Sequence, residues 1–315
     1  MTRANAFISA SNFALIGHCM VSLGQAAIRH RTVQERADRI LYVTDVGQAN
    51  HFDQVFQVGR KAGFHLKEAK GDVAAGTVTE STYASPEVRL EHVPFGLVQG
   101  EDGKKFKTRS GTTVKLKDLL DEAVRIARSD LETRAREGGA EIDYEHVAKV
   151  VGIGAVKYAD LAMNRESNYR FSYSKMLALN GNTAPYMLYA YARIQRIRRK
   201  VMGTLAQSNK EGGEASSDLA DFAFILEHPT ELALATQIMR LPEVLVRLET
   251  DLYPNQLCDY LFETSQKFNQ FYEQCPVSTA PTDALRGSRA SICAITADVL
   301  KLSLGLLGIG VVGRL

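Results

Sequence analysis

The feature that most constrains the fold is a change of hydrophobic period at about residue 112 of this 315-residue chain. Before that point, short apolar runs alternate with loops and one amphipathic helix. After it, apolar residues recur almost everywhere at three- and four-residue spacing, which is the period of a helix with one buried face. The sequence therefore predicts an α/β part followed by an all-α part.

In the first part, the run RILYVT at residues 39–44 predicts a strand, because it is apolar and rich in β-branched residues. A helix is expected over residues 49–62, with Gly63 as its stop. A second strand is expected over residues 88–98, where Pro94 confines it to an edge or a bend. Between these elements, residues 67–87 are small, polar and aperiodic and predict a surface insertion.

In the second part, helical periodicity continues to about Leu307. Glycines at 152, 154, 181, 212 and 213 are interpreted as breaks between helices. The expected helices cover residues 116–136, 144–151, 157–163, 172–179, 184–202 and 217–226, with several more beyond.

Composition excludes several classes of protein. No run of eighteen apolar residues occurs, which argues against a transmembrane segment, and the net charge of +2 is too small to indicate a nucleic-acid binder by itself. Cys19, Cys258, Cys275 and Cys293 are far apart and include no Cys-x-x-Cys pair. We therefore expect buried thiols in a reducing compartment rather than a zinc site or a disulfide scaffold.

The first 34 residues contain no Asp or Glu, a composition that organellar transit peptides share. The alternative is a divergent or truncated N-terminus over residues 1–25 that carries no targeting signal.

The loop from Gly100 to Gly111 gathers Lys104, Lys105, Lys107 and Arg109 between glycines. Mobile cations of this kind can bind polyphosphate. A charged run between two domains is more often a solvated loop.

Four stretches, at residues 41–56, 89–123, 151–161 and 180–195, resemble arginyl-tRNA synthetases, and together they cover the chain from about residue 26 to its end. The resemblance implies a partial Rossmann-like catalytic domain followed by an α-helical anticodon-binding bundle. The implied domains are a catalytic remnant with the Lys-rich loop at 26–112, a helical connecting, stem-contact region at 113–168 and the anticodon-binding domain at 169–315.

The resemblance also implies an activity and its partners. The family is an arginine–tRNA ligase, which uses ATP as its Mg²⁺ complex to attach L-arginine to its tRNA. We expect no protein-bound metal and no membrane partner, and we expect a monomer. The expected compartment is the cytoplasm, with a plastid or mitochondrion as the alternative.

For the catalytic site, the resemblance gives Lys107 and Lys104 the places of the two lysines in the signature loop of other class I synthetases, with Lys105 and Arg109 beside them. Cations there stabilise the charge that develops near the leaving pyrophosphate. The alternative is that they contact only tRNA phosphates. Gln48 matches a residue that lines the arginine pocket, and His51 would lie near the adenylate; helix capping is the alternative role.

For tRNA binding, the resemblance matches Tyr186, Tyr189 and Tyr272 with tyrosines that stack on unpaired anticodon bases, and places Leu315 beside the anticodon. Tyrosines on a helix are otherwise typical of a core. Arg193, Arg196 and Lys200 share one helix face and predict a basic stripe, which could also be an ordinary solvated face.

The chain departs from the family in two places. It lacks the His-x-Gly-His signature, of which Leu15 to His18 is a coincidental fragment, and Gly24 stands where the family has an aspartate that binds the guanidinium of arginine. The tRNA-elbow domain and the first strands are also missing, so we expect marginal stability before residue 100.

Three hypotheses follow for the function of the chain: an arginine–tRNA ligase, a catalytically impaired fragment or paralogue that binds tRNA, and a helical scaffold without RNA binding.

Overall fold

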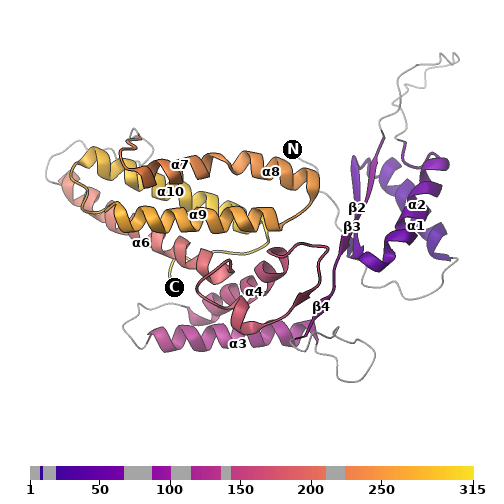
Figure 1. Ribbon diagram of the computed structural model, residues 1–315, viewed down its shortest axis with the longest axis horizontal. Coiled ribbons are helices and arrows are strands. Elements are labelled where there is room, and N and C mark those ends of the chain that lie inside the picture. The colour runs from indigo at the N-terminus through magenta and orange to yellow at the C-terminus, as the bar shows by residue number, and fades with distance from the viewer. Residues whose placement is uncertain (1–7, 10–18, 67–86, 101–114, 136–142, 211–223) are drawn as a thin grey trace, which may run out of the picture. The chain divides into compact units, whose positions relative to one another are not determined.

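The computed structural model describes residues 8–9, 19–66, 87–100, 115–135, 143–210 and 224–315 (Figure 1). The chain divides into two compact units. The first comprises Met1–Leu97 with Glu166–Asn168, and the second comprises Val98–Arg165 with Tyr169–Leu315. Each unit is described by itself.

The first unit contains a parallel sheet in the order β1-β2-β3. Its elements are β1 (Ile8–Ser9), α1 (Cys19–Val33), β2 (Arg39–Asp45), the 3-10 turn η1 (Val46–Gln48), α2 (Ala49–Lys61) and β3 (Arg89–Phe95). Strand β2 pairs with β3 from Arg39 opposite Arg89 to Asp45 opposite Phe95. Parallel neighbours need a crossover, and α2 supplies it.

The predicted strands and helix of this unit are confirmed, whereas the surface insertion predicted over residues 67–87 lies outside the described residues except for residue 87. The strand at 39–44 and the helix at 49–62 form as expected, and Gly63 ends the helix with a φ of +70°, which glycine adopts without strain. Pro94 lies in β3, an edge strand of the described sheet. Figure 1 shows α1 and α2 together on one side of the strands. The core between these elements consists of Ile28, Ile40, Phe52, Val55, Phe56, Val88 and Leu90.

The second unit is mainly helical, as expected. Its elements are β4 (Val98–Gln99), α3 (Leu116–Ala135), α4 (Tyr144–Leu161), β5 (Tyr169–Arg170), α5 (Tyr173–Met176), α6 (Ala184–Lys210), α7 (Pro229–Met239), α8 (Leu241–Asp251), α9 (Asn255–Gln274) and α10 (Asp283–Leu306). One continuous apolar core joins these helices, and Met187, Leu188, Leu261, Phe268 and Leu300 are completely buried in it.

Several predicted boundaries are wrong. Helix α4 is continuous across Gly152 and Gly154, where a break was expected, and α6 extends past residue 202 to Lys210. Gly152 is a packing residue: a Cβ there would lie 2.7 Å from the Val124 Cα on α3. Residues 224–227 have no regular structure although a helix was predicted to include 224–226, and the rest of that prediction lies outside the described residues.

The expectation of buried thiols is confirmed for the three cysteines whose side chains the structure describes. Cys258, Cys275 and Cys293 are free and buried. Burial raises the pKa of the Cys258 and Cys293 thiols to about 12. These thiols are therefore inert at neutral pH. Among the described helices, none combines the length and the hydropathy needed to cross a bilayer.

Candidate functional site

Gln48 lies at the carboxyl end of β2, where parallel sheets commonly bind their ligands. It is the last residue of η1 and the N-cap of α2. Its side chain is exposed and makes no cap hydrogen bond, so Gln48 does not cap the helix through its side chain. The cap of η1 is Asp45, whose carboxylate accepts from the Gly47 N–H at 2.8 Å.

His51 is half-buried in the first turn of α2 and presents its ring edge to Phe52, with centroids 5.4 Å apart. The other aromatic partner of Phe52 at this end is His92 of β3, which stacks on it at 4.9 Å. His92 also hydrogen-bonds through Nε2 to the Thr44 hydroxyl at 2.8 Å. Thr44 and His92 were not predicted, because their pairing depends on the register of β2 and β3.

Lys104, Lys105, Lys107 and Arg109 lie outside the residues that the structure describes. Their predicted role in binding ATP stays a prediction. Among the described residues, no group of three or more His, Cys, Asp or Glu side chains is arranged to hold a metal ion.

Asn269 of α9 links Tyr186 and Arg193 of α6, and Arg193 in turn contacts Tyr272 of α9. The Asn269 amide nitrogen donates to the Tyr186 hydroxyl at 2.7 Å, and its oxygen accepts from Arg193 Nη1 at 2.8 Å. The Arg193 guanidinium lies over the Tyr272 ring, 5.3 Å from its centroid. We call Tyr186, Arg193, Asn269 and Tyr272 the α6–α9 cluster.

The α6–α9 cluster combines buried support with an accessible rim. Tyr186 packs edge-on against Phe262, and Tyr272 stacks on the buried Phe268 at 6.1 Å. Tyr272 nevertheless remains 42% exposed, and Arg193 is exposed as well. Rings held from beneath and open at the rim suit contact with unpaired bases.

Tyr189 of α6 contacts α3. Arg134 of α3 donates through Nη1 to the Tyr189 hydroxyl at 2.5 Å, and its guanidinium lies 5.4 Å from the ring centroid. Tyr189, Arg134 and the half-buried Leu315 line one small depression. The structure thus brings Leu315 to Tyr189, two residues that are 126 positions apart in the sequence.

Two main-chain contacts hold the C-terminal tail that carries Leu315. Lys157 of α4 donates to the Gly308 carbonyl at 2.6 Å, and Arg199 of α6 donates to the Gly313 carbonyl at 3.2 and 3.3 Å. Ile309 and Val312 are buried between these points. The tail is therefore a fixed part of the second unit.

The predicted basic stripe divides into side chains with different contacts. Arg193 turns to α9, whereas Arg196 and Lys200 are exposed farther along α6. Sequence reasoning missed Asn269 and Arg134, which hold the tyrosines in place. Asn269 could have been found from its position one turn before Tyr272, but nothing local marks Arg134, whose partner is 55 residues away.

Two family models match the chain. Residues 20–173 match the catalytic domain of class I tRNA synthetases (R), and residues 187–315 match the DALR anticodon binding domain. The α6–α9 cluster lies across residues 186–272, almost entirely within the second match. The order of the two matches is the order of the sheet-containing and helical parts of the chain.

Curated relatives give the same result. The chain is 52% identical over 302 residues to an arginine–tRNA ligase of Synechococcus elongatus and 51% identical to that of Nostoc punctiforme. In both cases 95% of this chain is aligned, but it spans only 46% of the relative, so it has about half the length of the proteins that it matches.

Solved structures agree with the fold. An arginyl-tRNA synthetase from Plasmodium falciparum matches with a TM-score of 0.72 and 26% identity, covering 98% of this chain and 48% of that one. The Thermus thermophilus enzyme matches with a TM-score of 0.68 at 24% identity, over 89% and 42% of the two chains. The chain belongs to the arginyl-tRNA synthetase family, of which it carries a stretch of the catalytic domain and the anticodon-binding domain.

Proposed function

We propose that this chain forms part of an arginine–tRNA ligase and that its helical unit binds the anticodon loop of tRNA specific for arginine. The observation that carries the proposal is the α6–α9 cluster, in which the Asn269 amide joins Tyr186 to Arg193 and the Arg193 guanidinium lies over the Tyr272 ring. Ring faces stack on bases of any identity, and the neighbouring cation neutralises phosphate.

Tyr189 and Leu315 extend the proposed binding surface along α6, and Arg196 and Lys200 would contact tRNA phosphates farther along the helix. Phosphate contacts supply affinity, whereas contacts with bases supply discrimination between tRNAs. Substituting Arg196 should therefore weaken the binding of all tRNAs alike.

The tRNA proposal predicts that Tyr272→Ala weakens binding to arginine-specific tRNA by about 1–3 kcal/mol, because loss of one stacking platform has that effect. Filter binding with the full chain at one fixed salt concentration measures it. Tyr272→Phe is the matched control and should bind like the parent chain, since it keeps the ring. Unchanged affinity in Tyr272→Ala, or equal affinity of the parent chain for unrelated tRNAs, would contradict the proposal.

For the catalytic step we propose ATP, as its Mg²⁺ complex, and L-arginine as substrates. Gln48 and His51 would line the arginine and adenylate site at the carboxyl end of β2, while Lys104 and Lys107, with Lys105 and Arg109, would bind the phosphates.

We propose that the protein works as a monomer in the cytoplasm, with an organelle as the alternative. Arginine-dependent charging of tRNA by the full chain tests the activity. If no charged tRNA forms above a no-enzyme control, this chain alone lacks the ligase activity.

A second candidate function is tRNA binding without catalysis, and Gly24 favours it. Gly24 faces α2, where a Cβ would lie 3.4 Å from the Val55 Cγ1. The position that would carry a guanidinium-binding carboxylate is thus occupied by a residue with no side chain, packed against an apolar one. Specific tRNA binding combined with no charging would select this function.

A further inference from the structure

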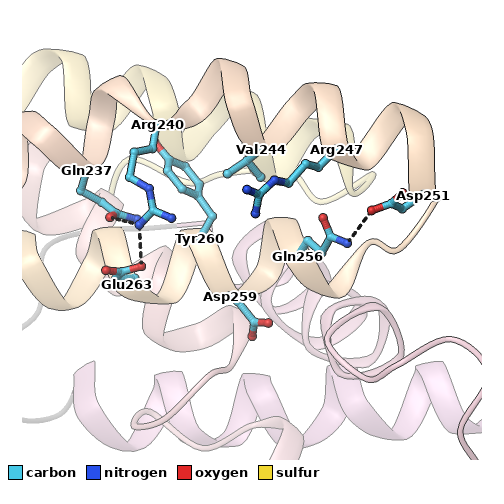
Figure 2. Close-up of a pocket in the computed structure, with 9 residues that line it drawn as sticks. All are labelled: Gln237, Arg240, Val244, Arg247, Asp251, Gln256, Asp259, Tyr260 and Glu263. Carbon is cyan, nitrogen blue, oxygen red and sulfur yellow. Dashed lines mark hydrogen bonds and ion pairs between the residues drawn. The ribbon is translucent and has the colours of Figure 1, made fainter.

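A cavity of about 410 Å³ lies between α7, α8 and α9 (Figure 2). No member of the α6–α9 cluster lines it, so it is a separate site from the proposed tRNA surface. Most of its lining is charged or amide-bearing. The lining residues are Gln237, Arg240, Val244, Arg247, Asp251, Gln256, Asp259, Tyr260 and Glu263.

One wall of the cavity contains a buried amide without an acceptor. Gln237 is only 2% exposed, and its Nε2 has no hydrogen-bond partner among the residues that the structure describes. Its Oε1 accepts from Arg240 Nη1 at 3.4 Å, and Figure 2 shows this amide reaching toward the Arg240 guanidinium. Buried donors are nearly always paired, so this N–H requires an acceptor that the described part of the chain does not supply.

Two guanidinium groups enter the same space. Figure 2 shows Arg240 and Arg247 extending between α8 and α9. Arg240 is 3.6 Å from the Glu263 carboxylate, which is a loose pair, and Arg247 bonds to Glu243, one turn earlier on α8, at 2.7 Å. Guanidinium groups together with an amide donor are the groups that bind an oxyanion.

The carboxylates of Asp251 and Asp259 also line the cavity, and neutral amides donate to them. Asp251 accepts from Gln256 at 3.4 Å, and Asp259 accepts from Asn182 at 3.2 Å. The lining carries three carboxylates, of Asp251, Asp259 and Glu263, and two guanidinium groups, so the cavity has excess negative charge. That excess favours a cationic group in the ligand.

We propose that this cavity binds a small molecule with an oxyanion at one end and an amine or guanidinium at the other. Gln237, Arg240 and Arg247 bind the oxyanion, and Asp251 and Asp259 bind the cation. A volume of about 410 Å³ is sufficient for such a ligand. The proposal does not depend on tRNA binding or on catalysis.

Calorimetric titration of the full chain with 6-aminohexanoate tests the proposal, because this probe carries only a carboxylate and an ammonium joined by an alkyl chain. Saturable binding is expected, with hexanoate and hexylamine at least about tenfold weaker, since each lacks one end. Gln237→Leu removes the unpaired donor and should weaken binding by about tenfold or more. Gln266→Leu, at an exposed position of α9 that does not line the cavity, is the matched control and should bind like the parent chain.

Arg247→Gln provides a second variant at an exposed position, in case Gln237→Leu alters folding, and should also lose about tenfold or more. The proposal is overturned if 6-aminohexanoate does not saturate, if hexanoate or hexylamine binds equally well, or if both variants bind like the parent chain. Charging and tRNA binding are measured separately, so failure here leaves the proposed function unaffected.

Discussion

At the scale of single residues, Asn269 joins two of the side chains that we propose to contact tRNA. Its amide is used at both ends, as donor to Tyr186 and as acceptor from Arg193. Tyr186 and Tyr272 were named from the sequence because each matched a family position, and Arg193 because it shares a helix face with Arg196 and Lys200. The residue that joins them could not be named in this way, since its role depends on α6 and α9 lying side by side.

A double-mutant cycle tests this link. Asn269→Ala and Tyr186→Phe should couple by about 0.5–1.5 kcal/mol in free energy of unfolding, because both remove the same hydrogen bond. The chain has no Trp, so unfolding in urea is best followed by circular dichroism at 222 nm. Asn269→Ala with Tyr189→Phe is the control pair, for which additive effects are expected, and zero coupling in the first pair would show that the bond contributes nothing.

At the scale of elements, the positions of strands and helices could be predicted from local pattern, and their boundaries partly. The run at 39–44 and the helix ending before Gly63 formed as predicted, since side-chain period and glycine conformation are local properties. The break expected at Gly152 did not form, because this glycine serves contact between two helices rather than a turn. A glycine that ends a helix and a glycine that lets two helices pack closely cannot be told apart from the sequence.

Gly152→Ala should therefore destabilise the second unit by about 1–3 kcal/mol, because the added methyl group would push α3 away from α4. Gly305→Ala in α10 is the matched control: nothing lies within 4 Å of the new Cβ, so the helix should gain up to about 1 kcal/mol from propensity. Thermal unfolding of both variants distinguishes them. A neutral or stabilising result for Gly152→Ala would show that the helices can separate without cost.

At the scale of the whole molecule, one buried ion pair joins α7 to α10. The Glu231 carboxylate is fully buried and accepts from Arg289 Nε at 2.6 Å and from the N–H groups of Glu227 and His228 at 2.9 and 2.8 Å. Burial alone would raise the pKa of Glu231, but the bonds from His228, Arg289 and Glu227 outweigh it, and the pKa is lowered from 4.5.

A lowered folded-state pKa means that Glu231 stabilises the fold above pH 4.5, and that this contribution is lost as pH falls through the lower folded value. Glu231→Gln should destabilise the chain by about 3 kcal/mol or more at pH 7, since it leaves Arg289 buried without a counter-charge. The difference from the parent chain should shrink below pH 4.5. Urea unfolding at several pH values measures it.

The control for this pair is Glu243→Gln, which removes an exposed pair with Arg247 on α8 and should change the free energy of unfolding by no more than about 0.5 kcal/mol. A difference between parent and Glu231→Gln that stays constant from pH 7 to pH 3 would contradict the assigned pKa direction.

The division into an α/β part and a helical part could be predicted at this scale because the change of hydrophobic period is a property of long segments. The candidate site residues were named from matched family positions or, for Arg193, Arg196 and Lys200, from helical spacing. The cavity between α7, α8 and α9 had no signal in the sequence, since it depends on one buried amide whose partner is missing and on carboxylates brought together by packing.

The C-terminal tail also affects how the protein can be handled. Lys157 and Arg199 hold it by its main-chain carbonyls, and Leu315 lines the depression beside Tyr189. A tag or reporter fused after Leu315 would begin inside that depression rather than in open solvent. Fusions for immobilisation or labelling should therefore be attached at the other terminus, or a carboxy-terminal tag should be removed before tRNA affinity is measured.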